Sequence, residues 1–259
     1  MIGAIVGDVI GSVHERAATK STEFPLFVGR SRFTDDTVLT VATAHAILTG
    51  ASYDIAYREY GRRHPNAGYG GSFYGWLFAE EPRPYNSWGN GSAMRVAPVG
   101  FAFNSLDDVL REAERTAAVT HNHPEGIKGS QATALAVYMG RSGASKEEIR
   151  KEISQRFNYD LNRTVDQIRP DYGFDVSCRG SVPEAIIAFL DSTDFEHAIR
   201  LAVSLGGDAD TQAAIAGGIA EAFYGGVPQP MVSAVRKHLD REFLAVIDAF
   251  DQAFAPESK

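Results

Sequence analysis

Residues 206–220 read GGDADTQAAIAGGIA, and this stretch predicts both the fold class and a candidate site. The Gly-Gly pair is typical of a turn that ends one helix, and Asp208, Asp210 and Thr211 would open the next. Residues 213–220 are small and apolar, as in a helix at the centre of a bundle. Surplus carboxylates at a buried helix start need a positive charge, because an unpaired buried charge is costly. Residues 201–220 contain no Lys or Arg, so a metal ion would meet this requirement.

The N-terminal segment, residues 2–11, contains glycines four residues apart at Gly3, Gly7 and Gly11. On a helix these glycines share one face, where the lack of side chains lets another backbone approach closely. The segment is too short to span a membrane. The pattern therefore predicts a buried, tightly packed helix.

Apolar residues recur with helical periodicity along most of the remaining chain. The predicted helices span residues 36–49, 105–119, 125–140, 145 onward, 181–190, 194–205, 209–224, 230–238 and 241–254. Two Ser–Glu pairs, at 145–148 and 181–184, have the spacing of a capping box. Gly50 follows the first helix of this set, at the position of a C′ residue.

Strand signals are weak and occur only in the short stretches 24–28 and 176–178. Residues 66–90 form one long irregular region rich in Gly, Pro and aromatic residues, and such loops are usually functional. Phe73 and Trp76, within it, are expected in the core. No linker or repeat interrupts the chain, so the sequence predicts a single all-α domain over residues 1–259.

The composition excludes several classes of protein. The chain has 25 Lys and Arg against 33 Asp and Glu, a formal charge of −8, which disfavours general binding to nucleic-acid backbones. The single cysteine, Cys178, allows no internal disulfide and no zinc site with several thiolates, and it is expected to be a small buried hydrophobic residue. No apolar run is long enough to cross a bilayer, and the N-terminus lacks signal-peptide features. These features predict a cytoplasmic protein that does not bind membranes.

A second acidic cluster, Phe33-Thr34-Asp35-Asp36-Thr37, lies at the start of a predicted helix. Adjacent carboxylates repel each other, but at an irregular helix start both could converge on a cation. Taken alone, the cluster is better explained by helix capping, with Asp36 as N-cap and Asp35 interacting with the helix dipole.

Together, the two clusters offer four carboxylates and the hydroxyls of Thr34 and Thr211. A donor set made only of oxygen suits Mg²⁺, Mn²⁺ or Ca²⁺ rather than Zn²⁺ or Cu²⁺. Four carboxylates exceed what one Mg²⁺ normally takes, so two metal ions are the natural number. The spacing of the clusters does not itself prove that they meet.

A third cluster, residues 87–95, reads SWGNGSAMR and ends the irregular region. Glycines beside an aromatic residue and an amide suit the close approach of a ligand with an aromatic base. The same residues would also suit a turn with an aromatic lid over the core.

In their order along the chain, the three clusters resemble the ADP-ribosylglycohydrolase family. The resemblance begins at residues 7–15 (GDVIGSVHE), includes Thr120-His121, and ends at residues 206–211, so it covers most of the chain up to about Gly225. It implies a compact orthogonal multi-helix bundle with a central cleft that holds two Mg²⁺ or Mn²⁺ ions. It also implies hydrolysis of the glycosidic bond between C1″ of ADP-ribose and an acceptor.

The resemblance assigns roles to individual positions. The implied metal ligands are Thr34, Asp35, Asp36, Asp208, Asp210 and Thr211. Glu15 and Asp36 are the implied catalytic acids and bases, and Glu15 is a metal-site gate in some members. Adenosine and its neighbouring ribose would be held by Ser87, Trp88, Gly89 and Asn90. A phosphate-contacting turn would be formed by Gly70, Gly71 and Ser72, and His121 would face the substrate.

Three departures from the family pattern leave the substrate preference open. Glu221 replaces a small residue, residues 121–126 differ from the animal enzymes, and Trp88 replaces a tyrosine. The expected partner is an ADP-ribosylated protein, with an acceptor such as arginine, or another ADP-ribose conjugate, and an ADP-ribosylated nucleic acid stays open. The chain is expected to be a monomer. The alternatives are a non-catalytic ADP-ribose-binding or crystallin-like member and a metal hydrolase of another nucleotide-like ligand.

Overall fold

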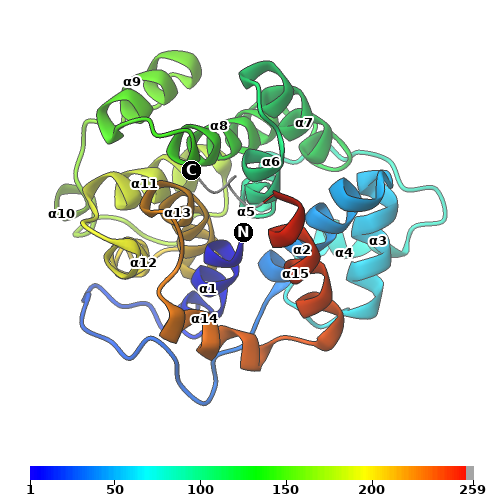
Figure 1. Ribbon diagram of the computed structural model, residues 1–259, viewed down its shortest axis with the longest axis horizontal. Helices are drawn as coiled ribbons and strands as arrows, with labels where there is room; N and C mark the ends of the chain where they lie inside the picture. The colour runs from blue at the N-terminus through cyan, green and yellow to red at the C-terminus, as the bar shows by residue number, and fades with distance from the viewer. Residues whose placement is uncertain (255–259) are drawn as a thin grey trace.

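The computed structural model describes residues 1–254, and over that range the chain forms helices and no strand (Figure 1). The helices are α1 (Ile2–Gly11), α2 (Asp35–Thr49), α3 (Tyr53–Arg63), α4 (Gly71–Phe78), α5 (Gly91–Met94), α6 (Ala97–Ala102), α7 (Leu106–Ala118), α8 (Pro124–Arg141), α9 (Lys146–Phe157), α10 (Val165–Ile168), α11 (Cys178–Asp191), α12 (Phe195–Ser204), α13 (Ala209–Tyr224), α14 (Gln229–Val235), the 3₁₀ turn η1 (Arg236–His238) and α15 (Arg241–Phe254). The predicted all-α class is confirmed. The end of the predicted domain, residues 255–259, lies outside the described residues.

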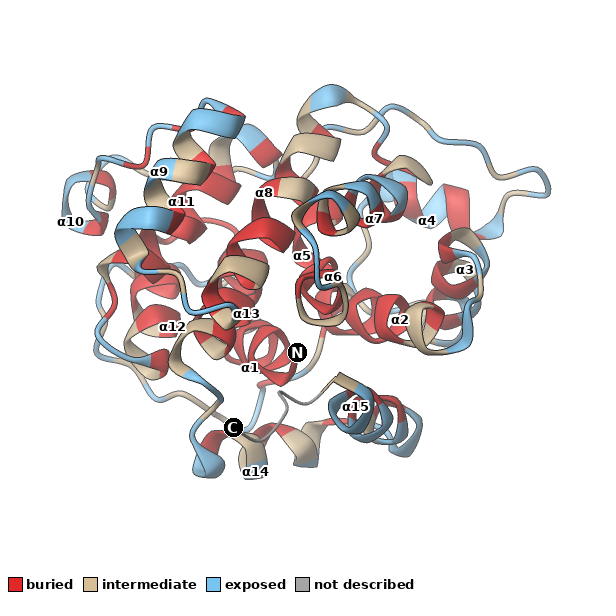
Figure 2. Cartoon of the chain, turned by 45° about the horizontal axis from the view of Figure 1, so that its top comes forward, coloured by how far each residue is buried: buried red, intermediate tan, exposed pale blue. Residues whose placement is uncertain are grey.

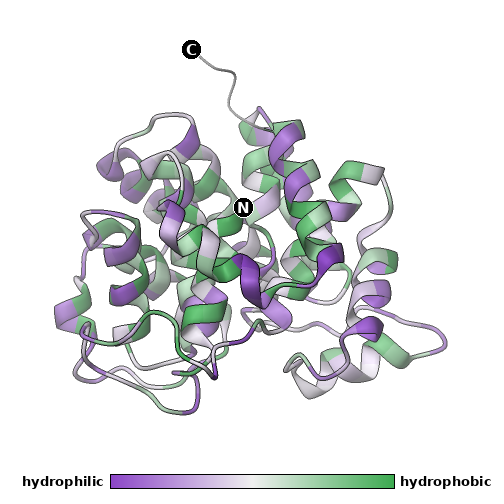
Figure 3. Ribbon diagram, turned by 60° about the horizontal axis from the view of Figure 1, so that its bottom comes forward, coloured by the Kyte–Doolittle hydropathy of each residue, from purple (hydrophilic) through white to green (hydrophobic). Residues whose placement is uncertain are grey.

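Helices α1 and α13 lie at the centre of the molecule and are buried along most of their length (Figure 2). Every residue of α1 is buried, which confirms the predicted buried N-terminal helix. Helix α13 packs against α1, α8, α11 and α12. The outer helices, α15 among them, contain both hydrophobic and hydrophilic residues, because one face packs inward and the other meets solvent (Figure 3).

Glycines bring the backbones of α1 and α13 into direct contact. A Cβ atom added at Gly7 would lie 2.0 Å from the carbonyl oxygen of Ala213, and one added at Gly3 would lie 2.5 Å from that of Gly217. The contact is reciprocal, since a Cβ at Gly217 would lie 2.3 Å from the carbonyl oxygen of Gly3. No residue other than glycine fits these positions without moving one helix away from the other.

Glu221 of α13 binds the N-terminal end of α1. Its carboxylate accepts from the Met1 ammonium at 2.9 Å and from the backbone N–H of Gly3 at 2.8 Å. The helix therefore begins at its second residue with an acidic partner for its free N–H groups. These contacts give Glu221 a structural role at the start of α1.

Helix starts agree with the sequence at some positions and differ at others. The predicted capping box at Ser145 is confirmed for α9. The N-cap of α2 is Thr34, whose hydroxyl accepts from the N–H of Asp36, so the prediction of Asp36 as N-cap is wrong. The predicted capping box at Ser181 is also wrong, because α11 starts earlier, with Ser177 as N-cap. Ser181 lies inside this helix and donates to the carbonyl of Ser177 at 2.7 Å.

The irregular region 66–90 is interrupted by α4, which the sequence analysis missed. Phe73 and Trp76 of this helix are buried as expected, and so is Cys178. The β-like stretch 24–28 forms no strand. It belongs to the long α1–α2 connection, where Arg200 of α12 donates to the carbonyls of Thr22 and Phe24.

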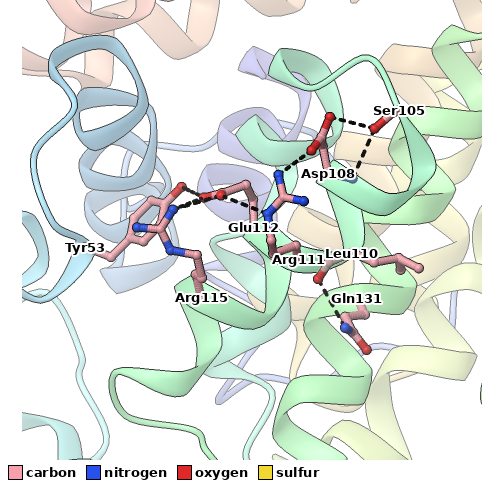
Figure 4. A network of polar contacts seen from close by, with 8 residues as sticks. All are labelled: Tyr53, Ser105, Asp108, Leu110, Arg111, Glu112, Arg115 and Gln131. Carbon is pink, nitrogen blue, oxygen red and sulfur yellow. Dashed lines mark hydrogen bonds and ion pairs between the residues drawn. The ribbon is translucent and has the colours of Figure 1, made fainter.

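Helix α7 is held to α3 and α8 by a polar network (Figure 4). The buried carboxylate of Glu112 accepts from Arg115 at 2.8 Å and from the hydroxyl of Tyr53 on α3 at 3.2 Å. Gln131 of α8 donates to the carbonyl of Leu110 at 3.1 Å. These contacts fix the helix whose C-terminal end leads into Thr120 and His121.

Among residues 1–254, none of the helices combines the length and the apolar composition that a membrane crossing requires.

The α1–α13 contact makes a prediction for stability. Gly7→Ala is expected to lower the free energy of unfolding by about 3 kcal/mol, because the added methyl overlaps the backbone of α13. Urea unfolding followed by circular dichroism measures this change. The control is Gly75→Ala in α4, where an added Cβ meets nothing within 4 Å, and it should be neutral or stabilising by less than about 1 kcal/mol. Equal losses in the two variants would contradict the close packing.

Candidate functional site

A cavity of about 450 Å³ opens beside the starts of α2 and α13. Its wall comes from five further parts of the chain: the α1–α2 connection, the turn before α4, the loop before α5, the α7–α8 connection and the segment before α11. The lining residues are Glu15, Arg16, Arg32, Thr34, Asp35, Asp36, Leu39, Ala67, Gly68, Gly70, Gly71, Ser72, Phe73, Tyr85, Ser87, Gly89, Asn90, Gly91, Met94, Arg95, His121, Phe174, Val176, Asp208, Asp210 and Thr211. A volume of this size is typical of a small-molecule site.

Three buried carboxylates meet beside this cavity, and two of them, Asp36 and Asp210, line it. Asp8 of α1, Asp36 of α2 and Asp210 of α13 each place one oxygen within 4.8 Å of the other two. The hydroxyl of Thr211 lies 3.4 Å from Oδ2 of Asp36, so residues of the two acidic clusters lie side by side. The structure thus brings together the two stretches that the sequence analysis paired.

Asp8 was missed by the sequence analysis. Its carboxylate accepts from the N–H and the hydroxyl of Thr34, at 2.9 Å and 2.7 Å, and from the N–H of Thr37 at 3.1 Å. The hydroxyl of Thr37 also donates to it. Four donors satisfy this carboxylate, so it orients the start of α2. The signal in the sequence was a single acid within an otherwise apolar helix.

Burial and mutual repulsion act together on these carboxylates. Burial, followed by the charges of Asp210 and Asp8, raises the pKa of Asp36 well above its ordinary value. Burial and the charge of Asp208 do the same to the pKa of Asp210. For Asp35, burial and the charge of Asp8 raise the pKa to about 8.

The cluster has no cationic partner among the described residues, where no Lys or Arg forms an ion pair with Asp8, Asp36 or Asp210. In addition, Oδ1 of Asp36 is buried without a hydrogen-bond partner in residues 1–254. Crowded carboxylates with one unpartnered oxygen, beside threonine hydroxyls, form a site that a hard divalent cation fits.

The loop before α5 is tied to the acidic start of α13. The side-chain amide of Asn90 donates to Oδ2 of Asp208 at 2.7 Å and to the hydroxyl of Ser181 at 3.2 Å. The N–H of Asn90 donates to the carbonyl of Val176 at 2.8 Å. One asparagine therefore positions an acidic residue and the loop that is predicted to bind adenosine.

The structure gathers most of the predicted site residues at one cavity. All six predicted metal ligands line it, as do Glu15, His121 and the glycines at 70, 71 and 89. Trp88 does not line it, and its side chain is 56% exposed. Residues that the sequence analysis did not single out also contribute, among them Arg95 and the exposed Phe174.

Comparisons with known proteins agree with this geometry. The family model described as ADP-ribosylglycohydrolase matches residues 1–258. "ADP-ribosylhydrolase ARH3" of Homo sapiens is 26% identical, over 95% of this chain and 90% of the relative. "ADP-ribosylarginine hydrolase Tri1" of Pseudomonas putida is 29% identical, over 91% of this chain and 72% of the relative. A solved structure titled "ADP-ribosylglycohydrolase-related protein complex" has a TM-score of 0.75 and 27% identity, and covers 97% of this chain and 95% of that chain.

The crowded carboxylates predict a pH-dependent stability of the metal-free protein. Because the folded-state pKa of Asp35 is about 8 and its ordinary value is 3.8, the native state keeps a proton that the unfolded chain has lost. The free energy of unfolding should therefore fall as the pH rises from about 4 to about 8. Urea unfolding after dialysis against EDTA measures this loss. It should be smaller in Asp35→Asn, and parallel pH profiles for both proteins would contradict the crowding.

Proposed function

Because the chain belongs to the ADP-ribosylglycohydrolase family, we propose that it hydrolyses the bond between C1″ of ADP-ribose and an acceptor, with two Mg²⁺ or Mn²⁺ ions at the acidic cluster. The observation that carries the proposal is the convergence of buried carboxylates without a counter-charge beside a cavity. The acceptor we propose is a protein side chain such as arginine, or a related ADP-ribose conjugate. The name of the Pseudomonas putida relative supports arginine.

The proposed metal ligands divide between two helix starts. Thr34, Asp35 and Asp36 open α2, whereas Asp208, Asp210 and Thr211 open α13. When bound, the ions would supply positive charge that binds the ribose hydroxyls and makes a water molecule more acidic. Asp8 would act behind them by holding Thr34 and Thr37 in place through its four hydrogen bonds.

The remaining walls suit the other parts of ADP-ribose. Gly70 and Gly71 precede and begin α4, so their N–H groups and that of Ser72 would bind the diphosphate. The loop with Ser87, Gly89 and Asn90 would hold the adenosine and its ribose. Trp88, exposed outside the cavity lining, would reach the ligand only from the rim.

Bond cleavage passes through an oxocarbenium-like transition state, as in other glycoside hydrolyses. Asp36 or Glu15 would take the proton of the attacking water and return it to the leaving group. Both residues line the cavity, and Glu15 lies close enough to add its charge to those of Asp208 and Asp210.

Two other functions fit parts of the sequence. A non-catalytic ADP-ribose-binding protein would need the cavity and no metal carboxylates, yet here all of those carboxylates are present. A metal hydrolase of another nucleotide-like ligand would use the same acids, and the other residues that line the cavity would then select its substrate.

Removal of the acids at the start of α13 tests the metal assignment. Asp208→Asn combined with Asp210→Asn should lower ADP-ribose release by more than about 100-fold, since losing even an outer-sphere partner costs about 10- to 100-fold. The assay measures ADP-ribose freed from peptides ADP-ribosylated on arginine or on serine. The control, Asp107→Asn with Asp166→Asn, removes the same charge from exposed positions and should keep full activity. Unchanged turnover in the Asp208→Asn, Asp210→Asn variant would contradict the metal assignment.

Ligand-dependent stability separates the enzyme from the binding protein. ADP-ribose should raise the melting temperature more in Mg²⁺ or Mn²⁺ than in EDTA, because a ligand that binds only the native state stabilises it. A shift of equal size in EDTA, without turnover of any conjugate, would favour the non-catalytic alternative.

A further inference from the structure

Arg95 is a fully buried arginine at the end of α5, beside the cavity. It forms no ion pair within residues 1–254, and its guanidinium lies 4.3 Å from the centre of the Tyr57 ring. Its Nη2 atom donates to the carbonyl of Thr116 at 2.8 Å and to the hydroxyl of Thr120 at 2.9 Å. Both hydrogens of Nη2 are thus directed at the end of α7 and the residues that follow it.

Thr120 links Arg95 to the ring of His121. Its Oγ1 lies 2.7 Å from Nδ1 of His121. Arginine can only donate, so Oγ1 accepts from Arg95 and its own hydrogen stays free for another acceptor. Within residues 1–254 the acceptor in reach is Nδ1. If Nδ1 carried a hydrogen instead, the buried threonine hydroxyl would lack an acceptor, which is unfavourable.

The ring of His121 is neutral at ordinary pH. Burial and then the charge of Arg95 lower its pKa well below the ordinary value. A neutral imidazole has one hydrogen, and with Nδ1 as acceptor that hydrogen is on Nε2.

Nε2 faces the glycine-rich wall of the cavity. A Cβ atom added at Gly91 would lie 3.1 Å from it, and one added at Gly89 would lie 3.6 Å from it. His121 lines the cavity, and no residue of the described chain accepts a hydrogen bond from Nε2. The N–H group is therefore free to donate to an oxygen atom of a ligand in the cavity.

We propose that Arg95 and Thr120 are positioning residues, which hold His121 in the Nε2–H tautomer so that it donates to an oxygen of bound ADP-ribose. The role of the ligand rests on the proposed function. The arrangement is rigid, because α7 is anchored to α3 and α8 by the network of Glu112 and Gln131 (Figure 4). A rigid donor needs no reorganisation when the ligand arrives.

The first measurement is the histidine ¹⁵N NMR spectrum of the Mg²⁺-loaded protein, with His121→Ala used to assign the resonances. The wild type should show His121 protonated at Nε2 alone. Thr120→Val keeps the shape of the side chain but removes the hydroxyl, and should yield a mixture of tautomers or Nδ1–H. Thr120→Ser, the matched control, keeps the hydroxyl and should retain the wild-type spectrum.

The second measurement is ADP-ribose affinity by calorimetry. Thr120→Val should weaken binding about fivefold to tenfold, the effect of losing one hydrogen bond, whereas Thr120→Ser should bind like the wild type. In a His121→Ala background, Thr120→Val should have no further effect, because it acts through that ring.

The two proposals fail in different ways. Protonation of His121 at Nδ1 in a wild-type protein that binds ADP-ribose would overturn the positioning role alone, as would an unchanged spectrum in Thr120→Val. Absence of ADP-ribose binding by the wild type would overturn the proposed function, and with it the role of His121 as donor to that ligand.

Discussion

The backbone contact between α1 and α13 is the constraint on which the rest of the structure depends. Gly3, Gly7 and Gly11 place no side chain where α1 meets the backbone of α13, so the two helices lie closer than side chains at these positions would allow. At Gly11 an added Cβ would lie 2.6 Å from the N–H nitrogen of Asp210. The same approach places Asp8 of α1 against the start of α13, and so the packing of the core sets the distances within the acidic cluster.

This packing creates an electrostatic cost at the centre of the molecule. Asp8 is stabilised by four donors from Thr34 and Thr37, whereas Asp36 keeps a buried oxygen without a partner within residues 1–254. Repulsion between Asp36 and Asp210 therefore persists in the protein alone and would be relieved by a cation. At the proposed metal site, the stability lost through this repulsion would be recovered when the ion binds.

Around this centre, the cavity wall is built from loops that side-chain and backbone hydrogen bonds hold in place. Asn90 links the loop before α5 to Asp208, and the carbonyl of Thr120 accepts from the N–H groups of Tyr85 and Ser87. His121 follows directly, at the end of an anchored helix. The result is a rigid cavity whose polar groups are in place before a ligand binds, as sites for small molecules generally require.

The sequence by itself determined the helices with clear periodicity, the glycine face of α1 and the two acidic stretches at the starts of α2 and α13, because these depend on local spacing. Tertiary structure decided what depends on distant partners. Ser177 rather than Ser181 caps α11, and α4 forms inside a Gly-rich region because Phe73 and Trp76 can be buried there. Likewise, only folding shows that Asp8 joins the acidic cluster and that Arg95 reaches Thr120, since each contact joins residues more than twenty positions apart. Local pattern predicts which chemistry is available, whereas packing decides which atoms meet.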